Sequence, residues 1–151
     1  MRHTILFLLR TYNDIDHIIP VIWKLSISGW RTYFLFVDDY HLDDYRIRFV
    51  TKAGAVHLRC KAIEWYHQQF RRWLWPRIIR RIADRVVAYT LGRYVVQSHR
   101  IEVIANEWSG AFGREMAEYF LRPANGLRLP CISLPHGYII WKNKEVNRLE
   151  I

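Results

Sequence analysis

Thr4-Ile5-Leu6-Phe7-Leu8-Leu9 is a continuous apolar run that ends at Arg10. A run of this kind is typical of a parallel strand that is buried on both faces of a sheet. Residues 32–37, Thr-Tyr-Phe-Leu-Phe-Val, form a second run, which Asp38 and Asp39 follow. The two runs therefore predict two parallel strands.

The segment between these runs carries apolar residues at helical spacing. They are Ile15, Ile18, Ile19, Ile22, Leu25 and Ile27. Asn13 or Asp14 offers an N-cap, and Gly29 is placed to end the helix. Because Pro20 falls inside the pattern, we expect the helix to begin near Pro20 or to be kinked there. Residues 4–37 thus predict a βαβ unit with a right-handed crossover.

Strand and helix patterns continue to alternate along the chain. We expect one or two helical turns in 41–49, a weak strand in 55–59, helices over 62–98 broken at Pro76, and a strand over 102–106. A helix beginning at Ser109 or Gly110, a turn-rich loop over 123–129 and a short buried strand ending at Leu134 complete the pattern. This alternation predicts an α/β fold with helices on both faces of a parallel sheet.

The composition is that of one folded domain with a basic surface. Of the 151 residues, 51% are apolar and 15% aromatic, which excludes a disordered polar chain. The net charge of +9 indicates an acidic partner, such as nucleic acid, an anionic membrane or a phosphorylated substrate. No apolar run is long enough to cross a bilayer, and the N-terminus lacks a signal-peptide cleavage site.

Cys60 and Cys131 lie far apart in apolar runs and match no metal-binding spacing. We therefore expect two buried, reduced thiols in a cytoplasmic protein, and neither a metal nor a cofactor.

The last predicted strand leads directly into Pro135-His136-Gly137-Tyr138. In an open α/β sheet, ligands bind outside the carboxyl ends of the strands. An imidazole at that point is well placed to move a proton, so His136 is a candidate general base. Alternatively, His136 only caps a turn.

A second candidate site is the loop Asn106-Glu107-Trp108-Ser109-Gly110, which follows a strand and opens a helix. Its backbone N–H groups could hold an anion, or Ser109 could simply cap the helix. Asp38 and Asp39 could bind a sugar hydroxyl or orient a base, or cap the next helix. The dinucleotide, P-loop, nucleophile-elbow and HExxH fingerprints are all absent from the sequence.

Basic residues alternate with Trp and Ile over residues 70–81. The candidate surface residues are Arg71, Arg72, Trp73, Trp75, Arg77, Arg80 and Arg81. An amphipathic element on anionic lipid has this composition, and so has a surface for single-stranded nucleic acid. The simplest alternative is a core helix with an arginine-covered solvent face. Nucleic acid is not favoured, because no RNA-binding signature accompanies the stretch.

These elements, together with Ile132-Ser133-Leu134-Pro135-His136-Gly137, resemble the N-terminal domain of GT-B fold transferases. The resemblance is to bacterial CDP-glycerol glycerophosphotransferases and capsule polysaccharide biosynthesis proteins, in which a strand leads to an aromatic-His-Gly motif followed by Lys. Here Pro135 stands in place of the usual Trp, and Lys142 stands one position later than the family's Lys.

The resemblance implies a Rossmann-like three-layer sandwich with a parallel sheet of about five strands. Residues 1–141 would form the acceptor-side domain, and 142–151 a polar tail or the start of a linker to a second domain. It implies His136 as the base that activates the acceptor hydroxyl. The expected substrate-binding residues are Asn106, Ser109, Gly110, Ser133, Gly137 and Tyr138.

The implied function is that of the acceptor-binding half of a bacterial surface-polysaccharide glycosyl- or glycerophospho-transferase. In GT-B enzymes a C-terminal domain holds most of the nucleotide-activated donor, so we expect the isolated chain to be inactive. A polysaccharide or lipid-linked acceptor would place it in the cytoplasm, peripherally on the inner membrane face. The alternative is a non-catalytic α/β module that docks on anionic membrane or on a partner through its Arg/Trp surface.

Overall fold

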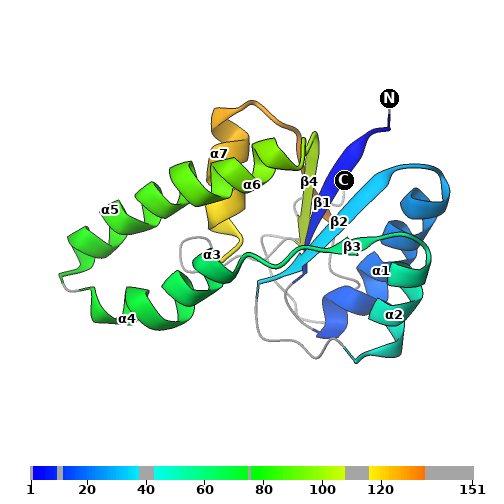
Figure 1. The fold of residues 1–151 in the computed structure, drawn as a ribbon, viewed down its shortest axis with the longest axis horizontal. Helices are drawn as coiled ribbons and strands as arrows, with labels where there is room; N and C mark the ends of the chain where they lie inside the picture. The colour runs from blue at the N-terminus through cyan, green and yellow to red at the C-terminus, as the bar shows by residue number, and fades with distance from the viewer. Residues whose placement is uncertain (1, 10–11, 38–42, 75, 108–115, 135–151) are drawn as a thin grey trace, which may run out of the picture.

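A single parallel sheet organises the chain. The computed structural model describes residues 2–9, 12–37, 43–74, 76–107 and 116–134. Within these residues, five strands pair in the order β3-β2-β1-β4-β5, and every pair is parallel (Figure 1). The strands are β1 (Thr4–Leu9), β2 (Arg31–Phe36), β3 (Val56–His57), β4 (Val103–Glu107) and β5 (Cys131–Leu134). The predicted α/β fold is confirmed.

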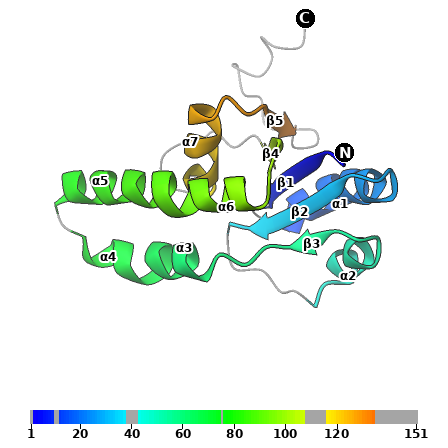
Figure 2. The same cartoon turned by 45° about the horizontal axis from the view of Figure 1, so that its top comes forward.

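Helices cover both faces of this sheet. Two of them are α1 (Tyr12–Ile27) and α2 (Tyr45–Lys52), and α7 (Glu118–Gly126) precedes β5. The connection from β3 to β4 consists of two longer helices, each with a π-helical turn in its middle. They are α3 (Lys61–Trp65), η1 (Tyr66–Phe70) and α4 (Arg71–Trp73), and then α5 (Arg77–Val87), η2 (Ala88–Gly92) and α6 (Arg93–Ser98). We call residues 61–98 the hairpin; Figure 2 shows its two arms side by side, extending away from the sheet.

The alternation of side chains along β1 divides the core into two layers. Ile5, Phe7 and Leu9 belong to the apolar cluster shared with α1 and α2, whereas Leu6 and Leu8 belong to the cluster shared with the hairpin and α7. All five side chains are at most 4% exposed. A strand buried on both faces explains why the run from Thr4 to Leu9 has no polar alternation.

Helix α1 differs from the sequence expectation at its start. The helix begins at Tyr12 and continues through Pro20, so the predicted start near Pro20 is wrong. Ile15 and Ile19 are buried in the first half of the helix, and their burial outweighs the one N–H that proline removes. Gly29, with a φ of +88°, lies just beyond the end of the helix, as predicted.

Two further predictions need correction. The expected loop over 123–129 is helical as far as Gly126, because Pro123 is buried in α7 and leaves the helix unbroken. Strand β5 is not buried: Cys131 and Ser133 are exposed, and Ile132 is 45% exposed, because β5 is the last strand in the sheet order. The predicted buried thiol at Cys131 is therefore wrong, whereas Cys60 is buried.

The predicted break at Pro76 is confirmed, since Pro76 is the N-cap of α5. The weak strand expected in 55–59 is present as β3. The proposed helix start at Ser109 or Gly110 and the tail 142–151 lie outside the described residues.

Candidate functional site

The carboxyl edge of the sheet brings two of the predicted substrate-binding residues together. In β4, Asn106 is the register partner of Leu8 in β1 on one side and of Ser133 in β5 on the other. Asn106 is half-buried and Ser133 is exposed. Register partners in a parallel sheet point to the same face, so both side chains lie on the face covered by α7 and the hairpin. An amide and a hydroxyl are groups that can donate hydrogen bonds to a ligand and accept hydrogen bonds from it.

The other predicted site residues lie outside the described residues. These are Ser109, Gly110, His136, Gly137 and Tyr138, together with Asp38 and Asp39. Their roles therefore stay predictions. In the sequence, Ser109 follows β4 and His136 follows β5, the two strands that carry Asn106 and Ser133.

A buried arginine holds the beginnings of α1 and α2 together at the same edge. The side chain of Arg46 is only 7% exposed and forms ion pairs with Asp16 of α1 and with Asp44. Asp44 is also the N-cap of α2, where its Oδ1 accepts the Arg46 backbone N–H at 2.8 Å. Hydrogen bonding to Asp44 raises the pKa of Arg46 despite burial, which acts in the opposite direction. These ion pairs of Arg46 were not predicted from the sequence.

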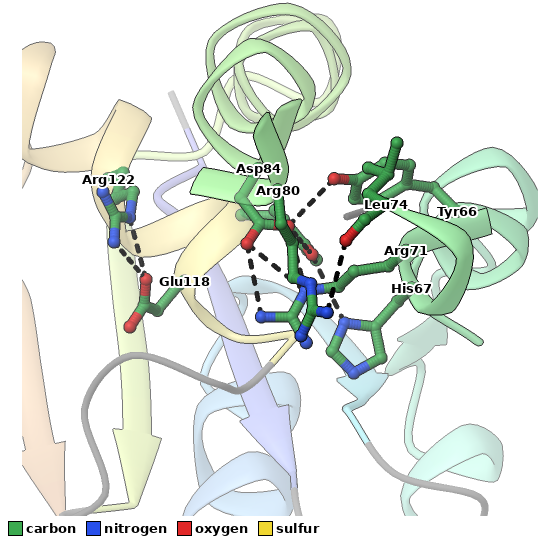
Figure 3. A network of polar contacts seen from close by, with 9 residues as sticks. Tyr66, His67, Arg71, Leu74, Arg80, Asp84, Glu118 and Arg122 are labelled. Carbon is green, nitrogen blue, oxygen red and sulfur yellow. Dashed lines mark hydrogen bonds and ion pairs between the residues drawn. The ribbon is translucent and has the colours of Figure 1, made fainter. Parts of the chain in front are cut away.

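Asp84 connects both arms of the hairpin to α7 (Figure 3). Its Oδ1 accepts hydrogen bonds from the Tyr66 hydroxyl at 2.9 Å, the Tyr119 hydroxyl at 2.9 Å and Arg71 Nε at 3.0 Å. Its Oδ2 accepts from Arg71 Nη2 at 3.2 Å. The donors come from η1, α7 and α4, so one carboxylate on α5 joins four elements.

The charges of this network are fixed by its hydrogen bonds. Burial acts to raise the pKa of Asp84, but the bonds from Arg71, Tyr119 and Tyr66 outweigh it, and the pKa is lowered. Burial raises the pKa of Tyr66 and of Tyr119, and the neighbouring Asp84 raises both further. At neutral pH the network is thus a carboxylate held by one guanidinium and two neutral phenols.

The arginines of residues 70–81 divide into two groups. Arg71 faces inward to Asp84, and the half-buried Arg80 donates from Nη2 to the Leu74 carbonyl at 3.3 Å. The exposed group is Arg72, Arg77 and Arg81. Trp73 is 84% exposed near the turn of the hairpin, and Trp75 lies outside the described residues. The structure thus brings only part of the predicted Arg/Trp surface to the outside.

An apolar groove runs between the two arms of the hairpin. Its volume is about 590 Å³, and every residue that lines it is apolar or aromatic. Trp65, Tyr66 and Phe70 contribute from one arm, and Ile79 and Ile82 from the other. Trp65 and Phe70 stack with their ring centroids 5.7 Å apart. Sequence reasoning identified the amphipathic stretch but not this groove, because the groove depends on how the two arms pair.

Two features are absent from the described residues. No group of three or more His, Cys, Asp or Glu side chains there could hold a metal ion. Within the same residues, no helix combines the length and the apolarity that crossing a bilayer requires.

No model of a known protein family matches the chain, and no curated protein matches it significantly.

Proposed function

We propose that the chain is the acceptor-binding domain of a bacterial surface-polysaccharide glycosyl- or glycerophospho-transferase, with His136 as its general base. The acceptor hydroxyl would give its proton to the imidazole as its oxygen attacks the activated carbon or phosphorus of the donor, and the nucleotide would leave. A nucleotide-binding domain of the GT-B type would hold the donor. The chain would lie in the cytoplasm, peripherally on the inner membrane face, where lipid-linked acceptors are found.

The observation that carries this proposal is the pairing of Asn106 with Ser133 at the carboxyl edge of a sheet with strand order 3-2-1-4-5. Ligands of open α/β sheets bind at this edge. The segments that follow β4 and β5 contain Ser109 and His136, so both motifs of the sequence resemblance leave the sheet at neighbouring strands. Gly137 would let an acceptor approach the backbone, and Ser109, Gly110 and Tyr138 would help to bind it.

The test is His136→Ala, assayed together with the donor-binding domain, with a nucleotide-activated glycerol or sugar as donor. We expect the rate of transfer to fall by about 10²- to 10⁴-fold, the usual scale for a positioned base. His3→Ala is the matched control, because His3 precedes β1 at the opposite edge of the sheet and pairs with Glu102 at 2.8 Å. An unchanged rate in His136→Ala would remove His136 from the chemistry, and turnover by the isolated chain would contradict the two-domain requirement.

The exposed apolar residues of the hairpin favour a second candidate, a non-catalytic module that docks on anionic membrane or on a partner. In that case the vesicle binding of His136→Ala would equal that of the wild type, and no transfer would be detected for either protein with any donor-binding domain. Transfer that depends on His136 would exclude this candidate.

A further inference from the structure

The hairpin exposes a large apolar surface, although most of the large apolar side chains on both faces of the sheet are buried. The exposed fractions are 84% for Trp73, 66% for Ile78, 59% for Trp65, 58% for Ile82 and 55% for Val86. Single exposed apolar residues are ordinary, but a contiguous patch of them marks a binding surface. The groove between the arms joins three of them into one surface, because Trp65, Ile82 and Val86 all line it.

The exposed arginines of α5 lie beside this apolar surface and repeat with the same spacing as its residues. Ile78, Ile82 and Val86 recur every four residues and form one stripe along the helix. Arg77, Arg81 and Arg85 have the same spacing one position earlier, and all three are exposed. Asp84 is two residues after Ile82, and at about 100° per residue it faces the opposite side of the helix. The outward side of α5 therefore pairs an apolar stripe with a row of guanidinium groups.

The charge of the hairpin is strongly one-sided. Residues 61–98 contain eight Lys and Arg residues but only two acidic residues, Glu64 and Asp84. Both carboxylates are engaged: Glu64 Oε1 accepts the Cys60 backbone N–H at 3.0 Å, and Asp84 holds the network in Figure 3. The outward charges are therefore almost entirely positive, which suits an anionic partner.

Three kinds of partner could meet an apolar and basic surface, and only one of them matches both of its properties. A second copy of the chain would bring two strongly positive hairpins together, and their charges would repel. Single-stranded nucleic acid could stack its bases on Trp65 and Trp73. The stripe beside the arginines of α5, however, is Ile, Ile and Val, which offers no platform for stacking. An anionic bilayer satisfies both halves of the surface, since it offers hydrocarbon beneath a layer of phosphates.

We propose that the hairpin docks flat on an anionic lipid bilayer. Ile78, Ile82 and Val86 enter the boundary between headgroups and acyl chains, and the groove between the arms takes up acyl chain. Arg77, Arg81 and Arg85 bind lipid phosphates at the edge of the inserted stripe, with their aliphatic stems along it. This proposal rests on the peripheral membrane location of the proposed function, and it names the surface by which the chain binds the membrane.

The test is flotation of the purified chain with vesicles of phosphatidylcholine containing phosphatidylglycerol, and with vesicles of phosphatidylcholine alone. We expect binding only to the anionic vesicles. Ile82→Glu should weaken it by about tenfold, because the new charge would have to enter the apolar boundary. Ile27→Glu is the matched control, since Ile27 is 51% exposed at the end of α1, away from the hairpin. Both side chains are exposed, so both variants should fold, and circular dichroism checks this.

The arginine half of the surface is tested with a second matched pair. Arg81→Gln with Arg85→Gln should weaken binding to the anionic vesicles by at least about fivefold, an effect that disappears at high salt. Arg31→Gln with Arg48→Gln removes the same charge from exposed positions on β2 and α2 and should have little effect.

Equal losses in Ile82→Glu and Ile27→Glu would overturn the proposal, and so would equal binding to both kinds of vesicle. Tighter binding to a single-stranded oligonucleotide than to anionic vesicles, lost in the Arg81 and Arg85 variant, would assign the surface to nucleic acid instead. His136→Ala separates this proposal from the proposed catalytic role: it should bind vesicles as the wild type does, whether or not it loses transfer.

Discussion

Replacing Asp84 by Asn should weaken the network that ties the two arms of the hairpin to each other and to α7. The amide keeps one oxygen that can accept from Tyr66 and Tyr119, but its NH₂ group would meet the guanidinium of Arg71, donor against donor. Arg71 would then lie without its counterion in a position where its side chain is 19% exposed. The change removes one charge and nearly no volume, so packing is preserved.

The size of the effect follows from this burial. Removing one partner of a buried ion pair costs about 3–5 kcal/mol, and exposed pairs contribute about 0–1 kcal/mol. With both side chains 19% exposed, the lower end of the buried range applies, and we expect a loss of about 3 kcal/mol in the free energy of unfolding. In a domain of this length that corresponds to a fall in Tm of about 6–12 °C.

Urea unfolding at neutral pH, followed by circular dichroism, measures this loss. The matched control is Glu118→Gln, which also neutralises a carboxylate paired with an arginine, but Arg122 is one turn along the same helix and 40% exposed. That pair should contribute only about 0.3–0.5 kcal/mol. If Asp84→Asn costs no more than Glu118→Gln, the network does not hold the hairpin in place.

The pH dependence gives a second readout of the same prediction. The pKa of Asp84 is lower in the folded chain, so the unfolded chain binds its proton first as the pH falls. The stabilisation by Asp84 is therefore complete above the unfolded pKa, about 3.9, and is lost as the pH falls through the folded pKa. The difference between wild type and Asp84→Asn should thus be constant from pH 8 to pH 5 and shrink below about pH 4. A difference that grows on acidification would contradict the assigned charges.

Two further predictions concern packing and thiol reactivity. Gly92→Ala should destabilise the chain by about 3 kcal/mol or more, because the new Cβ would lie 1.8 Å from the Tyr119 carbonyl oxygen. Gly126→Ala is the control and should be neutral or stabilising, since the nearest atom to its new Cβ is 3.5 Å away. Thermal unfolding of the two variants measures the difference. A disulfide reagent such as Ellman's should modify one thiol quickly in the folded chain and the second only in urea. The fast thiol is the exposed Cys131, and the slow one is Cys60, whose burial raises its pKa to about 11. Equal stability of Gly92→Ala and Gly126→Ala would contradict the close contact at Gly92. Fast modification of both thiols in the folded chain would contradict the burial of Cys60.

The central strands of the fold could be predicted because their signal is local. A run such as residues 5–9 is apolar throughout because both faces of β1 are covered, and so short a run is more typical of a strand than of a helix. In β5, at the edge of the sheet, an apolar run led to the wrong prediction of a buried strand. Ile132 suggested a buried strand, but apolar content does not show whether another element covers a strand, and β5 is exposed.

The two prolines that lie inside helices also led to wrong predictions, because a local signal does not show how deeply a residue is buried. The cost of Pro20 in α1 and Pro123 in α7 is local, whereas the burial that offsets it comes from residues distant in sequence. The Asp84 network was also missed, although the sequence held a signal for it. Asp84 is the one acidic residue between Arg71 and Arg93, and an isolated carboxylate among arginines on an amphipathic helix is a candidate for an inward-facing ion pair.

The second arm of the hairpin also fixes a distance along the membrane surface. α5, η2 and α6 contain 11, 5 and 6 residues without a break, which at about 1.5 Å per residue makes a rod about 33 Å long. One end of the rod carries Ile78 and the other leads into β4, which carries Asn106. If the hairpin lies flat on lipid, the rod runs along the bilayer and sets how far the sheet lies from the inserted stripe. Shortening the rod by one turn would then bring the sheet about 5 Å closer to the anchored stripe.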